Sequence, residues 1–300
     1  MNMNQLETLL AISKTMSFRK AGELLNLTQP AVSAQIKSLE DEFQTILVNR
    51  NQPVTLTESG MIFLEQAEKM LQLQEELKQR LTDLQQLPQG NIQLGTTTSI
   101  AMQVLPRVLS YFQNQFPRIK TTIHSMTSAQ VVSSVENGSI DLGIAFQFEK
   151  NPLLESSILY YDNFELVVAP EHPLAQQSHA HIDCIQDLPM IMLTPDTAGR
   201  KFMDRTIKQF QIQPQIVMEL SSSEEVKRMV EINLGAAIIA RSSIVKEVKL
   251  GTLKQIHVHE LSIPQPVSVF YRTGRYLNAA IRQFLNDLKG MPESQFLGSE

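Results

Sequence analysis

The stretch Thr28-Gln-Pro-Ala-Val-Ser-Ala-Gln-Ile-Lys-Ser-Leu-Glu40 decides how the N-terminal part of this chain is organised. Thr28 can accept a hydrogen bond from an unpaired backbone N–H of a helix, and Pro30 stands in the first turn, where its missing N–H costs nothing. Apolar residues then recur at helical spacing, at Val32, Ile36 and Leu39. The pattern predicts a helix with one buried stripe, although an ordinary surface helix would show the same pattern.

The other face of this predicted helix carries amide and hydroxyl side chains. Gln29, Ser33 and Gln35 lie off the apolar stripe, with Lys37 beside them. Amides and hydroxyls can form hydrogen bonds with the edges of bases in the major groove of DNA. We therefore predict that this helix contacts duplex DNA.

Two shorter helices are expected before it. Apolar residues from Leu6 to Ile12 predict a helix that ends near Lys14. Ser17 can cap a second helix, whose apolar residues are Phe18, Ala21, Leu24 and Leu25. Gly22 inside that helix should cost about 1 kcal/mol relative to alanine. A capped, polar-faced helix after a short turn is a helix-turn-helix pattern, and a generic three-helix unit is the alternative.

Residues 49–57 are rich in turn formers between alternating residues, which predicts a short β-wing. Arg50 on this wing could reach a phosphate or the minor groove, or it could be a solvated turn residue. The chain has a net charge of −5, yet between Lys14 and Lys37 the one acidic residue is Glu23. The predicted DNA-contacting residues are Ser17, Arg19, Lys20, Thr28, Gln29, Pro30, Ser33, Gln35, Lys37 and Arg50.

Residues 58–87 form one long predicted helix without proline. Its apolar residues alternate at spacings of four and three, with Gln74 as a polar interruption. An average period of 3.5 predicts a two-stranded coiled coil, whereas packing against the chain's own second domain is the alternative. The predicted dimer seam consists of Phe63, Ala67, Met70, Leu77, Leu81 and Leu84.

Pro88-Gln89-Gly90 ends this helix, and strands then alternate with helices. The first set has strands at 91–94, 120–125 and 142–146 and helices at 101–115 and 129–137. The second set has strands near 164–169 and at 190–193, 215–220 and 236–240, with helices at 200–210 and 224–233. A strand from Val267 and a helix at 276–289 close the chain. This order predicts a mainly parallel α/β fold in two similar halves.

The residues Ser17-Phe18, Thr28-Gln-Pro-Ala-Val-Ser33 and Leu56-Thr57-Glu58-Ser59-Gly60, at their spacing, resemble the winged helix-turn-helix of LysR-type transcriptional regulators. The length and segment order extend the resemblance over the whole chain. It implies a winged helix-turn-helix at 1–60, a dimerising linker helix at 58–87 and a periplasmic-binding-protein-like effector domain at 91–292. One effector subdomain would span about 91–162 and 267–292, and the other about 163–266.

The resemblance also implies a function. Such a protein is a cytoplasmic dimer or tetramer that binds a pseudo-palindromic promoter site, works with RNA polymerase and activates or represses transcription. A small effector, which we expect to be an anionic metabolite, gates it. Many members carry an arginine at the place of Ala34, so this chain lacks one DNA contact that they have.

Three strand-to-helix junctions are the predicted effector site: Gly95–Ile100, Ser125–Ala129 and Thr194–Arg200. Hydroxyls and unpaired N–H groups at helix starts can hold an anion, although such hydroxyls are more often caps. Arg200 could bind the anion or pair with a nearby carboxylate. Thr97, Ser99, Thr197 and Arg200 match cleft positions in the resembled family. The full predicted set is Thr97, Thr98, Ser99, Ile100, Thr127, Ser128, Phe146, Thr197 and Arg200.

Other functions have weaker support in the sequence. The chain shows no signal peptide and no run of about 18 apolar residues, and the single Cys184 excludes an internal disulfide. His179, His181, His257 and His259 lack accompanying ligands at metal-binding spacing, so we expect no metal. No nucleotide-binding loop or catalytic constellation is visible, and we expect no cofactor and no enzyme activity. The competing class is a solute-binding or enzymatic α/β protein whose N-terminal helices only mediate assembly.

Overall fold

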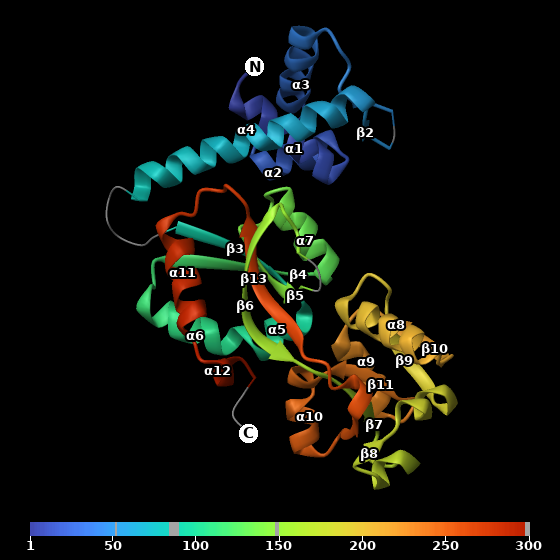
Figure 1. Ribbon diagram of the computed structural model, residues 1–300. Coiled ribbons are helices and arrows are strands. Elements are labelled where there is room, and N and C mark those ends of the chain that lie inside the picture. Colours follow the sequence, from blue (N-terminus) through green and yellow to red (C-terminus); the bar gives the residue numbers. More distant parts are fainter. Residues whose placement is uncertain (52, 84–89, 148–149, 298–300) are drawn as a thin grey trace. The chain divides into compact units, whose positions relative to one another are not determined.

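The computed structural model describes residues 1–51, 53–83, 90–147 and 150–297, shown as a ribbon in Figure 1. The chain separates into two compact units, Met1–Gln86 and Leu87–Glu300. Each unit has its own hydrophobic core, so each is described by itself.

The first unit begins with three helices, α1 (Met3–Thr15), α2 (Phe18–Leu25) and α3 (Gln29–Phe43). The predicted caps are confirmed: the Ser17 hydroxyl accepts a hydrogen bond from the Lys20 N–H at 3.3 Å, and the Thr28 hydroxyl accepts one from the Ala31 N–H at 3.4 Å. The predicted apolar stripe of α3 is fully buried. Of the apolar residues of α2, Ala21 is buried, Phe18 and Leu25 are partly buried, and Leu24 is exposed.

The predicted wing is a two-residue antiparallel ladder between β1 (Val48–Asn49) and β2 (Thr55–Leu56). Helix α4 (Glu58–Asp83) follows and packs on α1. Met70, Leu77 and Leu81 are exposed on α4, as is Leu73, which was not predicted as part of the seam.

Two residues assigned to the dimer seam are covered within this unit, Phe63 partly and Ala67 fully. Phe63 packs edge-on against the Phe43 ring, with centroids 4.9 Å apart, and Ala67 is buried. The first turns of α4 cover the three-helix core before the helix extends beyond it, which takes the buried Ala67 out of the predicted seam, whereas the assignment of Phe63 stays a prediction. Leu84 lies outside the described residues.

Gly22 in α2 is required by a close backbone approach, which corrects the expectation that alanine would be better there. A Cβ atom at Gly22 would lie 2.6 Å from the carbonyl oxygen of Leu27. We therefore expect Gly22→Ala to lower the free energy of unfolding by about 1–3 kcal/mol, as overpacking does. Gly290→Ala, where a Cβ meets nothing within 4 Å, is the control and should be neutral or stabilising. Urea denaturation measures both; a stabilising Gly22→Ala would contradict the expectation.

In the second unit, one lobe (lobe I) is built on a five-stranded sheet in the order β4-β3-β5-β13-β6. These strands are β3 (Gly90–Thr96), β4 (Ile119–Ser125), β5 (Leu142–Phe146), β6 (Leu154–Asp162) and β13 (Gln265–Arg272). β3, β4 and β5 are parallel, whereas β13 is antiparallel to both β5 and β6. The predicted parallel arrangement holds for β3, β4 and β5, but the sheet is mixed, because β13 returns from the other lobe and pairs antiparallel with β5 and β6.

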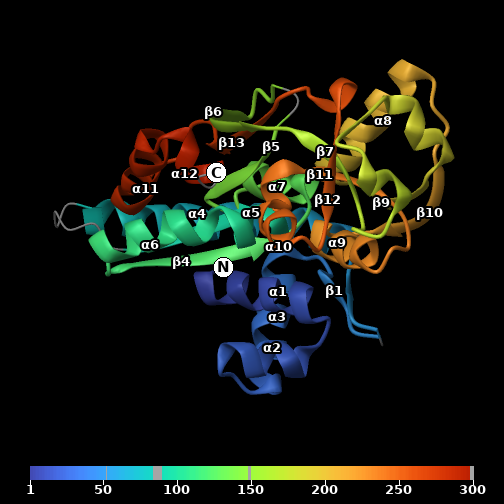
Figure 2. The ribbon, with the colours of Figure 1, turned by 90° about the horizontal axis from the view of Figure 1, so that it is seen from below.

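Helices cover both faces of this sheet (Figures 1 and 2). α6 (Leu105–Gln115), α11 (Ala279–Gly290) and α12 (Glu293–Leu297) pack in the main core, and α7 (Ser128–Glu136) packs on the opposite face. Side chains of a strand alternate between faces, so Val269 enters the main core while Phe270 packs under α7. α5 (Thr98–Gln103) precedes α6.

The other lobe (lobe II) holds a four-stranded sheet in the order β11-β7-β12-β8 and a parallel pair, β9 and β10. The strands are β7 (Phe164–Val168), β8 (His179–Ala180), β9 (Pro189–Leu193), β10 (Gln215–Leu220), β11 (Ala237–Ala240) and β12 (Lys254–Val258). Its helices are α8 (Ala198–Phe210), α9 (Ser223–Glu231) and α10 (Val245–Leu250). α8 and α9 lie beside β9 in both views (Figures 1 and 2).

The structure corrects several predicted element boundaries. The predicted helix 101–115 is two helices, because the chain bends at Val104, just before the Pro106 in α6. β6 and β12 were not predicted; β6 carries exposed and buried residues without a regular pattern. Asn233, which follows α9, has a φ of 59°, the left-handed conformation that asparagine tolerates.

Asp162 lies where β6 passes from lobe I into lobe II. It is 2% exposed and accepts hydrogen bonds from the backbone N–H groups of Asn163 at 2.9 Å and Ser242 at 3.3 Å. Burial raises the pKa of the Asp162 carboxyl group, and the hydrogen bonds from Ser242 and Asn163 only partly offset this effect.

A raised folded-state pKa gives a stability contribution that is present at low pH and is lost as the carboxyl group ionises. Asp162→Asn cannot ionise but keeps an acceptor oxygen. We therefore expect the variant to gain stability relative to the wild type as the pH rises from about 4 to about 8. Thermal unfolding of both proteins across this range measures the difference; parallel curves would refute the expectation.

Candidate functional site

The exposed face of α3 presents small polar side chains. Gln29, Pro30 and Lys37 are exposed, as is Ala34. Ser17 and Thr28 sit at the ends of α2 and α3, where their hydroxyls cap the helices. Gln29 and Lys37 are therefore the long side chains on this face of α3 that could reach into the major groove of DNA.

Gln35 was predicted on this exposed face, but its side chain is half-buried against α1. Its side-chain carbonyl accepts a hydrogen bond from the buried Thr8 hydroxyl of α1. Its place on the exposed DNA-contacting face is therefore corrected: Gln35 is half-buried and ties α3 to α1. The signal was Thr8, a polar residue within the apolar stripe of the first helix.

Arg50 is exposed, but its guanidinium has partners on α2 and α3. Its guanidinium forms an ion pair with Glu40 at 2.8 Å, lies 3.5 Å from the Ser33 hydroxyl, and stands over the Phe18 ring at 5.8 Å. Glu40 also accepts the N–H groups of Leu47 at 2.9 Å and of Val48. Glu40 therefore fixes the wing and its arginine against α3, a role that sequence reasoning missed.

The remaining predicted cations lie on α2. Arg19 is exposed and 3.7 Å from the Glu23 carboxylate, a pair that solvent screens. Lys20 is also exposed. Both can turn toward a phosphate at little cost, because a surface ion pair contributes at most about 1 kcal/mol.

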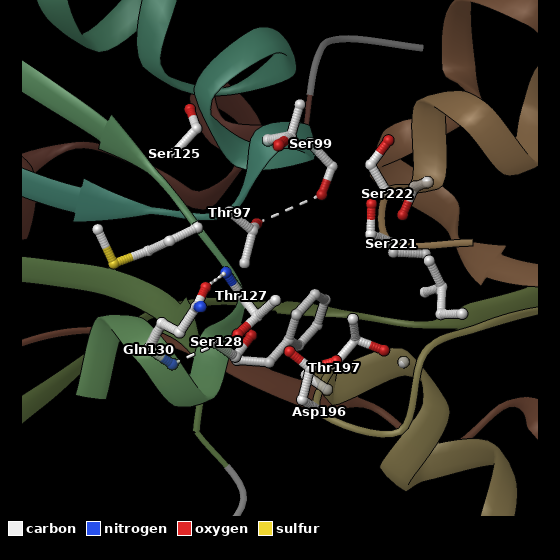
Figure 3. Close-up of a pocket in the computed structure, with 18 of the residues that line it drawn as sticks. Thr97, Ser99, Ser125, Thr127, Ser128, Gln130, Asp196, Thr197, Ser221 and Ser222 are labelled. Carbon is white, nitrogen blue, oxygen red and sulfur yellow. Dashed lines mark hydrogen bonds between the residues drawn. The ribbon is translucent and has the colours of Figure 1, made fainter. Parts of the chain in front are cut away.

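The second candidate site is a cavity of about 410 Å³ between the two lobes of the second unit (Figure 3). The cavity is rich in hydroxyl groups, which ten of its lining residues carry. These are Thr97, Thr98, Ser99, Ser125, Thr127, Ser128, Thr197, Ser221, Ser222 and Ser223.

The hydroxyls gather there because helices start at the cavity. The N-termini of α7, α8 and α9 all border it, with Thr127, Thr197 and Ser222 as their N-caps. Figure 3 shows these groups facing one another from the two lobes. An α-helix leaves its first N–H groups without an intrahelical partner, so three helix starts point donors and positive dipole ends at one space.

The hydrogen bonds show which hydroxyls are already occupied. The cap hydroxyls of Thr127, Thr197 and Ser222 each accept an N–H of their helix at 3.3–3.4 Å. Thr97 and Ser99 lie 3.3 Å apart, oxygen to oxygen, which Figure 3 marks with a dashed line. The sequence left open whether these hydroxyls cap helices or line a ligand site. Thr127 and Thr197 do both, because an N-cap hydroxyl stands at the N-terminus of its helix and these N-termini border the cavity.

Asp196 is the one charged side chain among the lining residues. The Thr194 hydroxyl donates to its carboxylate at 2.8 Å, and this bond lowers the pKa of Asp196 below its usual value. Asp196 therefore stays ionised and offers an acceptor to a ligand.

Two predicted effector residues are not in this cavity. Arg200 pairs with Asp204 at 2.8 Å and with Glu219, and it donates to the Leu193 carbonyl at 3.0 Å. Ile100 is buried in the core of the unit. Both assignments are corrected: Arg200 is the third residue of α8 and turns back onto β9 and β10, while Ile100 faces inward on α5.

The other predicted effector residues line the cavity, Phe146 included, whose ring lies 5.3 Å from that of Phe164. The predicted effector set does not contain Ser221–Ser223, Gln130 or Phe164. It also omits Ser125 and Asp196, although these two fall within the predicted junctions Ser125–Ala129 and Thr194–Arg200. For Ser221–Ser223 the signal existed, because they follow a strand and precede a helix like the three predicted junctions.

In the part of the chain that the structure describes, no group of three or more His, Cys, Asp or Glu residues is arranged to hold a metal ion. His179 packs against His257, with ring centroids 5.5 Å apart. Within the same residues, no helix has both the length and the apolar character needed to cross a bilayer.

Two family models match the chain. Residues 3–61 match the bacterial regulatory helix-turn-helix protein of the lysR family, and residues 85–291 match the LysR substrate binding domain. A "Probable RuBisCO transcriptional regulator" of Phaeodactylum tricornutum is 32% identical over 296 residues, which cover 96% of each chain.

Solved structures show the same fold. Full-length CbnR in complex with its target DNA aligns with a TM-score of 0.72 at 18% identity, covering 96% of this chain and 99% of that one. The regulatory domain of Synechocystis CcmR in complex with 2-PG aligns with a TM-score of 0.63 at 21% identity, covering 67% of this chain and 96% of that one. Together the two family models span both units, and the chain therefore belongs to the LysR family of transcriptional regulators.

Proposed function

We propose that this regulator binds a hydroxylated small anion in the cavity between its lobes and that this ligand controls how it binds promoter DNA. The observation that carries the proposal is the cavity of ten hydroxyl-bearing residues at the starts of α5, α7, α8 and α9. The regulator acts as a cytoplasmic dimer or tetramer together with RNA polymerase, needs no cofactor and catalyses no reaction.

The charges of the cavity limit the ligand. Helix N-termini bind phosphate, sulfate or carboxylate without a basic side chain, and the lining offers none. Asp196 repels a second negative group and accepts a hydrogen bond. We infer a ligand with its anionic group at one end and hydroxyls at the other, such as a hydroxy acid or a phosphorylated polyol.

The relatives support both halves of the proposal. CbnR was solved on its target DNA and CcmR with the small molecule 2-PG. The ligand shifts the regulator between two states only if it binds one of them more tightly. Because the cavity wall comes from both lobes, a change in their spacing changes the ligand contacts.

A thermal-shift screen of the full-length protein with hydroxy acids and phosphate esters, 2-PG among them, tests the ligand class. A ligand at 100 times its Kd stabilises the protein by about 2.7 kcal/mol. We expect Ser128→Ala, which removes a cavity hydroxyl, to weaken binding about tenfold. Ser110→Ala on the exposed face of α6 is the control. No stabilisation by any member of the panel would refute the ligand class.

DNA binding is tested separately, with operator fragments selected from genomic DNA by the full-length protein. We expect Gln29→Ala to weaken specific binding by about 1–3 kcal/mol while non-specific binding changes little. Fluorescence anisotropy over a salt series measures both. Equal losses on both kinds of DNA would remove Gln29 from base recognition, and the lack of any salt-sensitive DNA binding would refute the proposal.

A further inference from the structure

A second cavity, of about 380 Å³, adjoins the hydroxyl-lined cavity between the lobes, which we call the effector pocket. Ser128, Phe146 and Ala198 line both cavities, so they form the wall between them. The second cavity has its own apolar floor and its own charged rim.

The rim of the second cavity is basic, in contrast to the effector pocket. Among the described residues that line it, Lys150, Lys201 and Arg205 are basic and Glu136 is acidic, which gives three positive charges minus one, or +2. The Glu136 carboxylate accepts a hydrogen bond from the Asn151 amide. In the effector pocket the lining charge is the single negative charge of Asp196.

These cations come from both lobes. Lys150 follows β5 in lobe I, whereas Lys201 and Arg205 stand four residues apart on α8 of lobe II and therefore on the same helix face. The floor is apolar and consists of Val132, Phe146 and Leu154. A basic rim above an apolar floor suits a molecule with a charged end and a hydrocarbon body.

We propose that this cavity is a second ligand site, which takes an organic anion with an aromatic or branched body. Its carboxylate or phosphate lies between Lys150 and Lys201, and its body packs against Phe146. A ligand so placed bridges the two lobes. Because Phe146 also borders the effector pocket, binding at one site changes the affinity of the other, and by linkage the effect is reciprocal.

The test uses phenyl phosphate as the probe, with calorimetric titration of the full-length protein at low salt. We expect saturable binding that Lys201→Glu and Lys150→Glu each weaken at least about tenfold, since each reverses a charge beside the anion. Lys208→Glu makes the same change at an exposed position of α8 that lines neither cavity, and it should change the Kd less than about twofold.

Ser99→Asp places a negative charge in the effector pocket alone and separates the two sites. Phenyl phosphate binding that survives Ser99→Asp but not Lys201→Glu supports the proposal. Binding that is lost in Ser99→Asp, an equal loss in Lys208→Glu, or no saturable binding at all would overturn it. None of these outcomes depends on DNA binding or on the effector class proposed above.

Discussion

Replacing Lys227 with methionine is expected to lower the free energy of unfolding of the second unit by about 3–5 kcal/mol. Lys227 is 1% exposed, although it stands on α9 beside the effector pocket. Its ammonium group lies 2.8 Å from the Glu247 carboxylate, 2.7 Å from Glu224 and 2.8 Å from the Ser243 carbonyl oxygen.

The large effect follows from what the substitution leaves behind. Glu247 is 7% exposed, so without Lys227 its carboxylate stays buried with no opposite charge. Removing one partner of a buried pair costs more than the pair itself contributes, because the remaining charge has lost its hydration. A double variant that combines Lys227→Met with Glu247→Gln removes this buried charge as well. We expect it to recover part of the free energy of unfolding that Lys227→Met loses.

Arg228→Ala is the matched control, because Arg228 is the next residue on α9 and also pairs with a glutamate, Glu231, at 2.7 Å. Its side chain is 70% exposed, so we expect a loss below about 1 kcal/mol. Chemical denaturation of the full-length proteins, followed by circular dichroism, measures all three. Losses of similar size in Lys227→Met and Arg228→Ala would contradict the assigned role of the buried pair.

Leu77→Glu is expected to convert the regulator into a monomer and to weaken its binding to a two-site operator about 100-fold. Met70, Leu73, Leu77 and Leu81 form an exposed apolar stripe along α4. A charge in a coiled-coil seam loses its hydration without gaining a partner. In a monomer the two copies of α3 are no longer linked, so binding of one copy to the first half-site no longer raises the affinity of the other copy for the second half-site.

Met61→Glu is the control, since Met61 is an exposed apolar residue two and a half turns before Met70 and thus on the opposite face of α4. Analytical ultracentrifugation compares the oligomeric states, and anisotropy with one-site and two-site DNA compares the affinities. We expect Leu77→Glu to lose affinity for the two-site DNA only. A Leu77→Glu protein that remains a dimer would show that the stripe is not the dimer interface.

The sequence alone determined the elements that depend on local pattern. The caps Ser17 and Thr28, the buried stripe of α3 and the alternation of strands and helices after Gly90 follow from short-range rules of spacing and hydrogen bonding. Gln35 shows the limit of such rules, since its side chain is hydrogen-bonded to Thr8 of another helix.

The tertiary structure decided what depends on neighbours distant in sequence. Periodicity along α4 could not tell Phe63, which packs on Phe43, from Leu77, which is exposed, because both fall on the same face. Likewise, a helix-start arginine predicts an anion site, but Arg200 is satisfied by Glu219 from β10.

The effector pocket depends both on local sequence pattern and on tertiary packing. The sequence marked each strand-to-helix junction by its hydroxyls, because capping is local. That the junctions before α5, α7 and α8 meet at one space, together with the start of α9 and with Asp196 as the lining charge, follows only from the packing of the two lobes. The same packing places Lys150 near α8 and Lys227 against Glu247, contacts between segments that no local rule of sequence relates.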